Sequence, residues 1–105
     1  MTHVYNLKTE NGQWLAQVLL SDDGMFAAVS DWGNFAFAWR SYGDDFREFL
    51  LDINIEYFAG KMSNSVNQIE IGRRVDRITS KFSEHVLPAL QNAIKIELGN
   101  EKGGL

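Results

Sequence analysis

The first forty residues alternate between apolar and polar positions with a period of two, which is typical of β-strands. Four turn-forming pairs interrupt the alternation at intervals of about ten residues: Asn11-Gly12, Asp23-Gly24, Trp32-Gly33 and Tyr42-Gly43. This spacing is that of a β-meander, in which consecutive strands are joined by hairpins. We therefore predict four strands, at about Val4–Lys8, Trp14–Leu20, Met25–Ser30 and Phe35–Arg40.

The alternation also predicts that one face of this sheet lies on a core. In the fourth strand one face carries Phe35, Phe37 and Trp39, and in the second strand one face carries Trp14, Ala16, Val18 and Leu20. Small residues occupy several positions where larger strand formers are usual, namely Ala27, Ala28, Ala36 and Ala38. Either a helix approaches the sheet closely at these alanines, or the strands leave a shallow groove there.

The strongest helical pattern covers Asp44–Met62. Asp45 is a suitable N-cap, and Gly60 suits the left-handed position that ends many helices. At about 100° per residue, one apolar arc is formed by Phe46, Phe49, Leu50, Ile53 and Tyr57, and a second apolar strip by Leu51, Ile55 and Phe58. We therefore predict a single helix that is packed between two partners.

The remainder of the chain predicts a polar linker, Ser63–Asn67, and two further helical segments. The first has apolar positions at Ile71, Val75, Ile78 and Phe82, and the second covers Ser83–Leu98, with a kink or break expected at Pro88 and an end at Gly99. The fold class is thus α+β, a four-stranded antiparallel β-meander followed by about three α-helices packed on one face. Residues 1–99 are expected to form one domain and residues 100–105 a disordered tail.

Composition narrows the functional classes. The chain has 105 residues, a net charge of −4 and no cysteine, which argues against strong nonspecific nucleic-acid binding and excludes thiolate chemistry and disulfides. No apolar run approaches the roughly 20 residues of a membrane span, and the polar start is unlike a signal peptide, so we expect a cytoplasmic protein.

Recognisable catalytic motifs are absent. The sequence contains no phosphate-binding glycine loop, no Gly-x-Ser-x-Gly elbow and no His-Glu-x-x-His pair, and its two histidines, His3 and His85, lie far apart. We therefore predict a non-enzymatic protein with no catalytic residues, no metal site and no cofactor.

Two patterned charge groups are candidate binding surfaces. Acidic residues recur every four positions at Asp44, Glu48, Asp52 and Glu56. They form either an ordinary solvated face or a docking stripe for a host protein with a basic surface. Trp32, in a predicted hairpin turn, is a candidate aromatic anchor for the same partner.

The second group is basic and lies on the segment after the linker: Arg73, Arg74, Arg77 and Lys81. It is either a solvated face or, as the alternative function, a contact surface for nucleic acid or an acidic partner. It could also pair with the acidic group within the chain or in a homodimer. A third hypothesis is a small hydrolase or ligand-binding fold with a groove over the alanine-rich strands.

The order of features between Ser30 and Met62 resembles a known group of proteins. The sequence has an Asp-x-Gly-Asn turn, an aromatic strand ending in Trp39-Arg40, then Phe46-x-x-Phe49-Leu50 and Tyr57-x-x-Gly60-Lys61. This order resembles a family of small uncharacterised proteins encoded by bacteriophages and prophages. The resemblance implies expression in a bacterial host and a role as an inhibitor or adaptor of host machinery, including anti-defence proteins.

Overall fold

The computed structural model describes the backbone of residues 1–63 and 73–103, and the side chains of residues 1–63 and 77–101. Four strands are followed by three helices. The elements are β1 (Thr2–Lys8), β2 (Trp14–Ser21), β3 (Met25–Ser30), β4 (Gly33–Ala38), α1 (Phe46–Asp52), α2 (Ile55–Ser63) and α3 (Arg73–Gly103). This order confirms the predicted α+β class.

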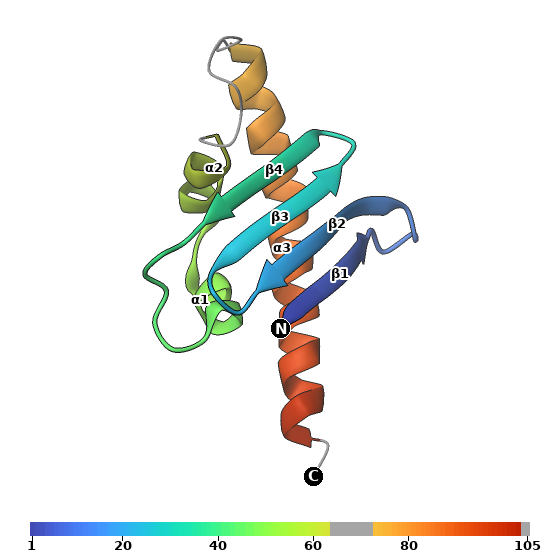
Figure 1. Ribbon diagram of the computed structural model, residues 1–105. Coiled ribbons are helices and arrows are strands. Elements are labelled where there is room, and N and C mark those ends of the chain that lie inside the picture. The colour runs from blue at the N-terminus through green and yellow to red at the C-terminus, as the bar shows by residue number, and fades with distance from the viewer. Residues whose placement is uncertain (64–72, 104–105) are drawn as a thin grey trace.

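The strands form one sheet in the order β1-β2-β3-β4, and each neighbouring pair is antiparallel, as a meander requires. One row of paired residues runs across all four strands from Tyr5 through Val18 and Ala28 to Phe35, and all four are buried. Figure 1 shows α3 crossing behind the strands, with α1 and α2 on the same side. The helices therefore cover one face of the sheet, as predicted, and leave the other face open.

A β-bulge at the start of β2 changes which side chains point inward. Lys8 pairs with Trp14 and Leu7 with Ala16, so that Leu15 is an extra residue in β2. Leu15 and Ala16 are both buried, whereas Trp14 is exposed. The prediction that Trp14 shares a face with Ala16 is therefore wrong, because the bulge interrupts the period of two.

Aromatic side chains join the sheet to the helices. The ring of Phe26 meets Trp39 edge-on at a centroid distance of 6.3 Å and Phe58 of α2 at 5.4 Å. Phe35 of β4 stacks on Phe82 of α3 at 4.0 Å. Each of these rings is buried, and edge-to-face and offset arrangements of this kind add to the free energy gained by burial.

The single helix predicted for Asp44–Met62 is wrong, because the structure has two helices there. The backbone at Ile53 is extended, with φ −89° and ψ 151°, and ends α1. Asn54 then begins α2, since its side-chain oxygen accepts a hydrogen bond of 2.8 Å from the N–H of Tyr57. A side chain that caps the next turn competes with continuation of the preceding helix. α2 runs through Gly60 and ends at Ser63.

The opposite error occurs in the last part of the chain, where one helix replaces the two predicted segments. α3 continues through Pro88 and past Gly99 to Gly103. Of the kink or break predicted at Pro88, the break is therefore wrong, and so is the helix end at Gly99, because residues 100–103 continue α3. Residues 64–67 of the predicted linker, Ile71, and residues 104–105 lie outside the described residues. Apolar residues on both sides of Pro88, including Leu87 and Leu90, are buried, and this packing offsets the hydrogen bond that proline cannot donate.

Candidate functional site

The four acidic residues predicted as a stripe are all exposed, but they do not share one helix. Asp44 precedes α1, Glu48 and Asp52 lie on α1, and Glu56 lies in the first turn of α2. The break at residues 53–54 therefore leaves only Glu48 and Asp52 at a helical spacing of four. Within the described residues none of the four carboxylates forms an ion pair or accepts a hydrogen bond, so their charges lack a partner there.

The start of α1 is held by Asp45, which is its N-cap, as predicted. Its side chain accepts hydrogen bonds from the N–H of Arg47 at 2.8 Å and of Glu48 at 3.4 Å. The cap satisfies backbone donors that a helix start leaves free. Asp44 and Glu48 are thereby placed at the positive end of the α1 dipole, where a carboxylate is favoured.

The end of α1 is held by Gln91 of α3. Its side-chain amide donates hydrogen bonds to the carbonyl oxygens of Leu50, at 2.9 Å, and Ile53, at 3.0 Å. These carbonyls would otherwise lack partners, because the helix stops at this point. Gln91 therefore fixes the α1–α2 junction against α3, and sequence reasoning missed it because no local pattern connects residues 38 and 41 positions apart.

Two adjoining hollows follow the seam between α1 and α3. The first, of about 470 Å³, is lined by Ile53, Asn54, Ile55, Glu56, Leu87, Pro88 and Gln91. The second, of about 460 Å³, is lined by Glu48, Leu51, Asp52, Lys95, Leu98 and Gly99. They adjoin because Asp52 and Ile53 are consecutive on one side, and Gln91 and Lys95 are one helical turn apart on the other. We refer to the two hollows together as the α1–α3 groove.

The groove combines apolar walls with a mainly acidic rim. Glu48, Asp52 and Glu56 lie on the rim, opposed by the single cation Lys95. Leu51 and Ile55, from the second apolar strip of the sequence, line the groove and remain half-buried or exposed. The strip was thus a usable sequence signal for the apolar lining that α1 and α2 contribute to this groove.

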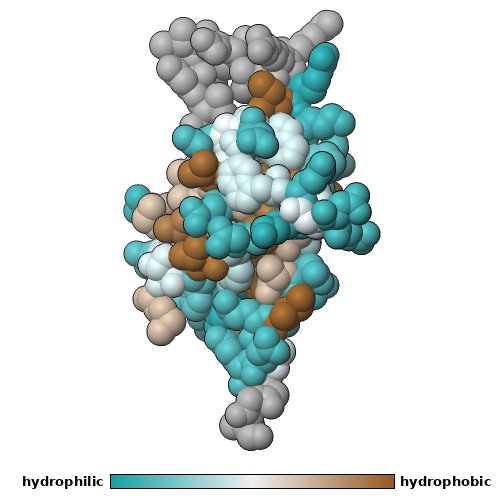
Figure 2. Space-filling view, turned by 90° about the vertical axis from the view of Figure 1, so that its right-hand side faces the viewer, coloured by the Kyte–Doolittle hydropathy of each residue, from teal (hydrophilic) through white to brown (hydrophobic). Residues whose placement is uncertain are grey.

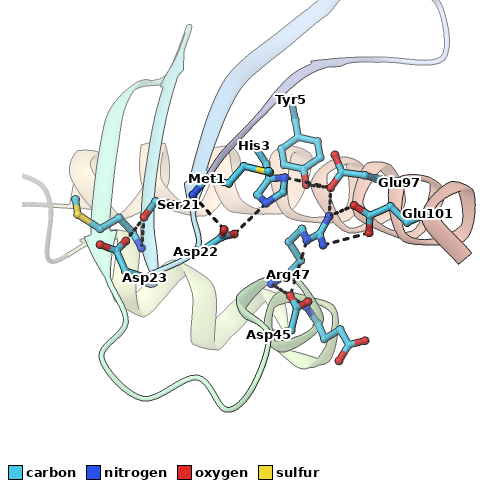
Figure 3. A network of polar contacts seen from close by, with 12 residues as sticks. Met1, His3, Tyr5, Ser21, Asp22, Asp23, Asp45, Arg47, Glu97 and Glu101 are labelled. Carbon is cyan, nitrogen blue, oxygen red and sulfur yellow. Dashed lines mark hydrogen bonds and ion pairs between the residues drawn. The ribbon is translucent and has the colours of Figure 1, made fainter.

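A separate polar network ties α1 to α3 and β1 (Figure 3). Arg47 of α1 forms ion pairs with Glu97 and with Glu101, the latter at 3.0 Å, and its side chain is only 13% exposed. The Tyr5 hydroxyl donates a 2.7 Å hydrogen bond to the Glu97 carboxylate. His3 lies between Asp22, at 3.0 Å, and Glu97, at 3.6 Å. Sequence analysis missed this network because its members lie 50 and 92 positions apart along the chain, and because it placed Glu101 in a disordered tail.

The network shifts the pKa values of its members. Burial raises the pKa of Tyr5, and the hydrogen bond to Glu97 raises it further. Burial also raises the pKa of Glu97, but the hydrogen bonds from Tyr5 and Arg47 outweigh it, so that this pKa lies below its ordinary value. Glu97 is therefore held ionised and acts as the common acceptor for groups from α1 and β1.

Trp32 is half-buried in the β3–β4 turn, where it packs against the core. Its ring stacks on that of His85 of α3, with centroids 5.3 Å apart and planes 6° apart. One face of the indole is thus covered by an exposed histidine. Trp32 thus packs against α3 at His85 and is not among the residues that line the α1–α3 groove.

The predicted basic face lies on the first turns of α3. Arg77 and Lys81 are exposed and one helical turn apart, and Lys81 lies 4.0 Å from Glu84. Arg73 and Arg74 begin α3, and their side chains lie outside the described residues. None of the ion pairs in the described part of the chain joins this basic face to the acidic rim of the groove.

The alanine-rich strands do form a hollow, of about 280 Å³, on the open face of the sheet. It is lined by Leu19, Ala27, Ala28, Val29, Asn34, Phe35 and Ala36. This resolves the alternative left by the sequence, since Ala27 and Ala36 face away from the helices while Ala28 is buried beneath them. The lining contains no titratable side chain that could transfer a proton.

The fold and its surfaces define a small α+β protein that has a groove between two helices, with acidic side chains along the rim of the groove. The sequence from residue 1 to 92 matches the family model Phage_phiTE_072, described as a phage family, and the chain belongs to this family. The match confirms the resemblance noted for residues 30–62 and extends it over most of the chain. No curated protein and no solved structure matches the chain. None of the helices within the described residues is long and apolar enough to cross a membrane.

Proposed function

We propose that this phage-family protein is a non-enzymatic binding protein that takes a basic, partly apolar segment of a host protein into the α1–α3 groove. One observation carries the proposal. Three exposed carboxylates without ion-pair partners in the described residues, Glu48, Asp52 and Glu56, lie on the rim of two adjoining hollows with apolar walls. In this setting the protein acts in the host cytoplasm as an inhibitor or adaptor of host machinery, anti-defence roles included.

The residues that line the groove indicate which side chains the host segment should contain. Rim ion pairs are each worth about 0.2–1 kcal/mol, which is too little to carry specific binding. Most of the affinity should come from one or two apolar side chains that enter beside Ile55 or Leu51, since buried anchors dominate interface energies. The carboxylates would then steer Lys and Arg side chains to the rim and speed association.

The test compares two triple charge reversals that change net charge equally. The groove variant is Glu48→Lys, Asp52→Lys and Glu56→Lys, and the control reverses three exposed acids elsewhere, Glu10, Asp31 and Glu84. Each protein is used to capture partners from bacterial host lysate at moderate salt, with identification by mass spectrometry. We expect capture of one host protein to fall at least tenfold, by about 1.4 kcal/mol or more, in the groove variant alone.

Equal capture by the groove variant and the wild type would contradict the proposal, and equal loss in both variants would reduce it to a net-charge effect. A second readout uses the absence of cysteine, because Ile55→Cys introduces a unique thiol into the groove. A photoactivatable cross-linker on that thiol should join the same host protein. The same reagent on Ser80→Cys, exposed on α3, should not.

A second candidate function, nucleic-acid binding, is favoured by the exposed pair Arg77 and Lys81. It predicts DNA or RNA binding that falls steeply with salt, because phosphate contacts release counterions. The variant Arg77→Gln with Lys81→Gln, which replaces both cations by neutral residues, should then lose this binding, while the groove variant keeps it. Absence of any binding at low salt would remove this candidate.

A further inference from the structure

We propose that the open face of the sheet is an interface between two copies of this chain, which pack sheet against sheet. This inference concerns a different surface from the α1–α3 groove and does not depend on the proposed function. We assign the face to a second copy because its strands lack like charges that would meet across such an interface, and because large side chains lie beside a hollow that they can fill.

Large apolar side chains are unusually exposed on the open face. Val4 is 51% exposed, Leu19 39%, Met25 50% and Val29 51%. They come from three strands, and Figure 2 shows brown and tan side chains along the left-hand edge of the molecule, where this face is seen from the side. A contiguous exposed apolar patch on a small protein indicates an interaction site more often than an accident of sequence.

The charge distribution argues that the occupant is a copy of the chain. The four strands contain no Asp, Glu or Arg, and Lys8, at a corner of the sheet, is their only lysine. The chain as a whole has 14 acidic residues and a net charge of −4, so that two copies repel each other over most of their surface. The open face is where two copies can meet without burying like charges.

The open face has both protruding side chains and a hollow, which are the two complementary features that a twofold interface needs. One cross-strand row runs through Val4, Leu19, Ala27 and Ala36, so that large side chains lie beside small ones. The small residues form the hollow of about 280 Å³ described above. In an isologous dimer the same patch serves both subunits, so Leu19 or Val4 of one copy can fill the hollow of the other. Two sheets of identical twist also pack face to face at about −30° without distortion.

The area of the open face determines the affinity that we expect for the dimer. Four strands about 4.8 Å apart, with about six residues rising about 3.3 Å each, give a footprint of roughly 400 Å² per copy. Two such faces total roughly 800 Å², which is below the roughly 1,200–2,000 Å² of stable specific interfaces and in the range of weak, transient ones. We therefore expect a reversible dimer with a dissociation constant on the order of tens of micromolar. The dimer would leave the α1–α3 groove of each copy exposed on its outer side.

The experiment is sedimentation analysis of the full chain over a concentration range from about 1 µM to about 1 mM, which brackets the expected dissociation constant. The wild type should change from monomer to dimer across this range. The variant Leu19→Lys with Val29→Lys should stay monomeric throughout. These changes bring the net charge toward zero, which by itself favours association, so loss of the dimer must come from the face.

The control is the single substitution Ile96→Lys, at an apolar residue of α3 that is 57% exposed and lies off the sheet. It should dimerise as the wild type does. A wild type that is monomeric at every concentration would overturn the proposal, as would a dimer that survives the double variant or one that the control also loses.

A spin-label measurement on the wild-type face covers the case in which the double variant fails to fold. Single labels at Lys8→Cys and Lys95→Cys lie on the sheet corner and on the helical layer, and the chain has no other thiol. Facing sheets are about 10 Å apart, so the intermolecular distance between Lys8 labels should be clearly shorter than that between Lys95 labels. The reverse order would place the helices, not the sheets, at the interface.

Discussion

The side-chain amide of Gln91 donates a 3.0 Å hydrogen bond to the carbonyl oxygen of Ile53, at the point where the chain passes from α1 to α2. A second bond from the same nitrogen reaches Leu50 at 2.9 Å. One residue of α3 thus satisfies two carbonyls that the helix end leaves free, and shapes one wall of the α1–α3 groove.

Gln91→Leu should therefore destabilise the protein by about 1–3 kcal/mol, the cost of leaving partly buried carbonyls without a donor. Urea unfolding at neutral pH measures this change. Asn92→Leu, at the exposed neighbouring position, is the control and should change stability by less than about 0.5 kcal/mol. Equal effects of the two substitutions would show that the Gln91 hydrogen bonds contribute nothing.

Gly24→Ala should be more damaging still. Gly24 has φ +94°, and a Cβ atom there would lie 2.1 Å from the carbonyl oxygen of Trp39. The Gly24 carbonyl also accepts the N–H of Trp39 at 2.8 Å, so neither backbone can move away freely. We expect a loss of about 3 kcal/mol or more, or failure to fold, measured by thermal and urea unfolding.

The matched control for this steric argument is Gly12→Ala. Gly12 has a similar φ of +85°, but nothing lies within 4 Å of its Cβ position. Gly12→Ala should lower the free energy of unfolding by about 1 kcal/mol, which is the conformational penalty of placing alanine at a positive φ. Comparable losses at both glycines would mean that the contact with Trp39 is not the cause.

Arg47→Met should make stability less dependent on pH in the acid range. The pKa of Glu97 is lowered in the folded protein by the hydrogen bonds from Tyr5 and Arg47, which outweigh burial. Its contribution is therefore present above the ordinary pKa of a glutamate, about 4.3, and is lost as pH falls through the lower folded value. Removing Arg47 raises the folded pKa of Glu97 and so removes part of this contribution.

The measurement is urea unfolding of the wild type and Arg47→Met at pH 7, 5, 4 and 3. The wild type should lose more stability between pH 5 and pH 3 than the variant does. Asp22, whose pKa is lowered by the N-terminal ammonium and His3, should retain its acid dependence in both. Arg40→Met, at an exposed arginine outside the network, should behave as the wild type. Parallel pH profiles for all three proteins would contradict the role assigned to Arg47.

Pro88→Ala should stabilise the protein by about 1–3 kcal/mol. Pro88 is exposed inside α3, where proline cannot donate the main-chain hydrogen bond and crowds the preceding turn. The expected result is a higher melting temperature with an unchanged fold. Ser80→Ala, at an exposed position of the same helix, should change stability by less than about 0.5 kcal/mol. A destabilised Pro88→Ala would mean that proline is required for the packing of α3 against α1.

The sequence by itself determined the sheet. Strand alternation and glycine turns are local signals, and they predicted four strands, their antiparallel order and a core on one face of the sheet, but not which face the helices cover. Asp45 was likewise predictable as a cap, because an N-cap depends only on the residues that follow it. Family membership rested on the order of local features in residues 30–62 and is confirmed over residues 1–92.

Tertiary structure decided where the helices begin and end and which charges lie together. The periodicity of residues 44–62 is nearly continuous, yet Asn54 and the distant Gln91 stabilise a break within it. In α3 the signals of Pro88 and Gly99 are local helix breakers, but burial against the sheet and the pairing of Arg47 with Glu101 carry the helix past both. The groove arises only when α1 lies against α3, so the acidic pattern and the apolar strip of Leu51 and Ile55 could be seen in the sequence, but the opposite wall from α3 could not. Local propensities amount to tenths of a kcal/mol up to about 3 kcal/mol per residue, and the burial of a helix face can outweigh them.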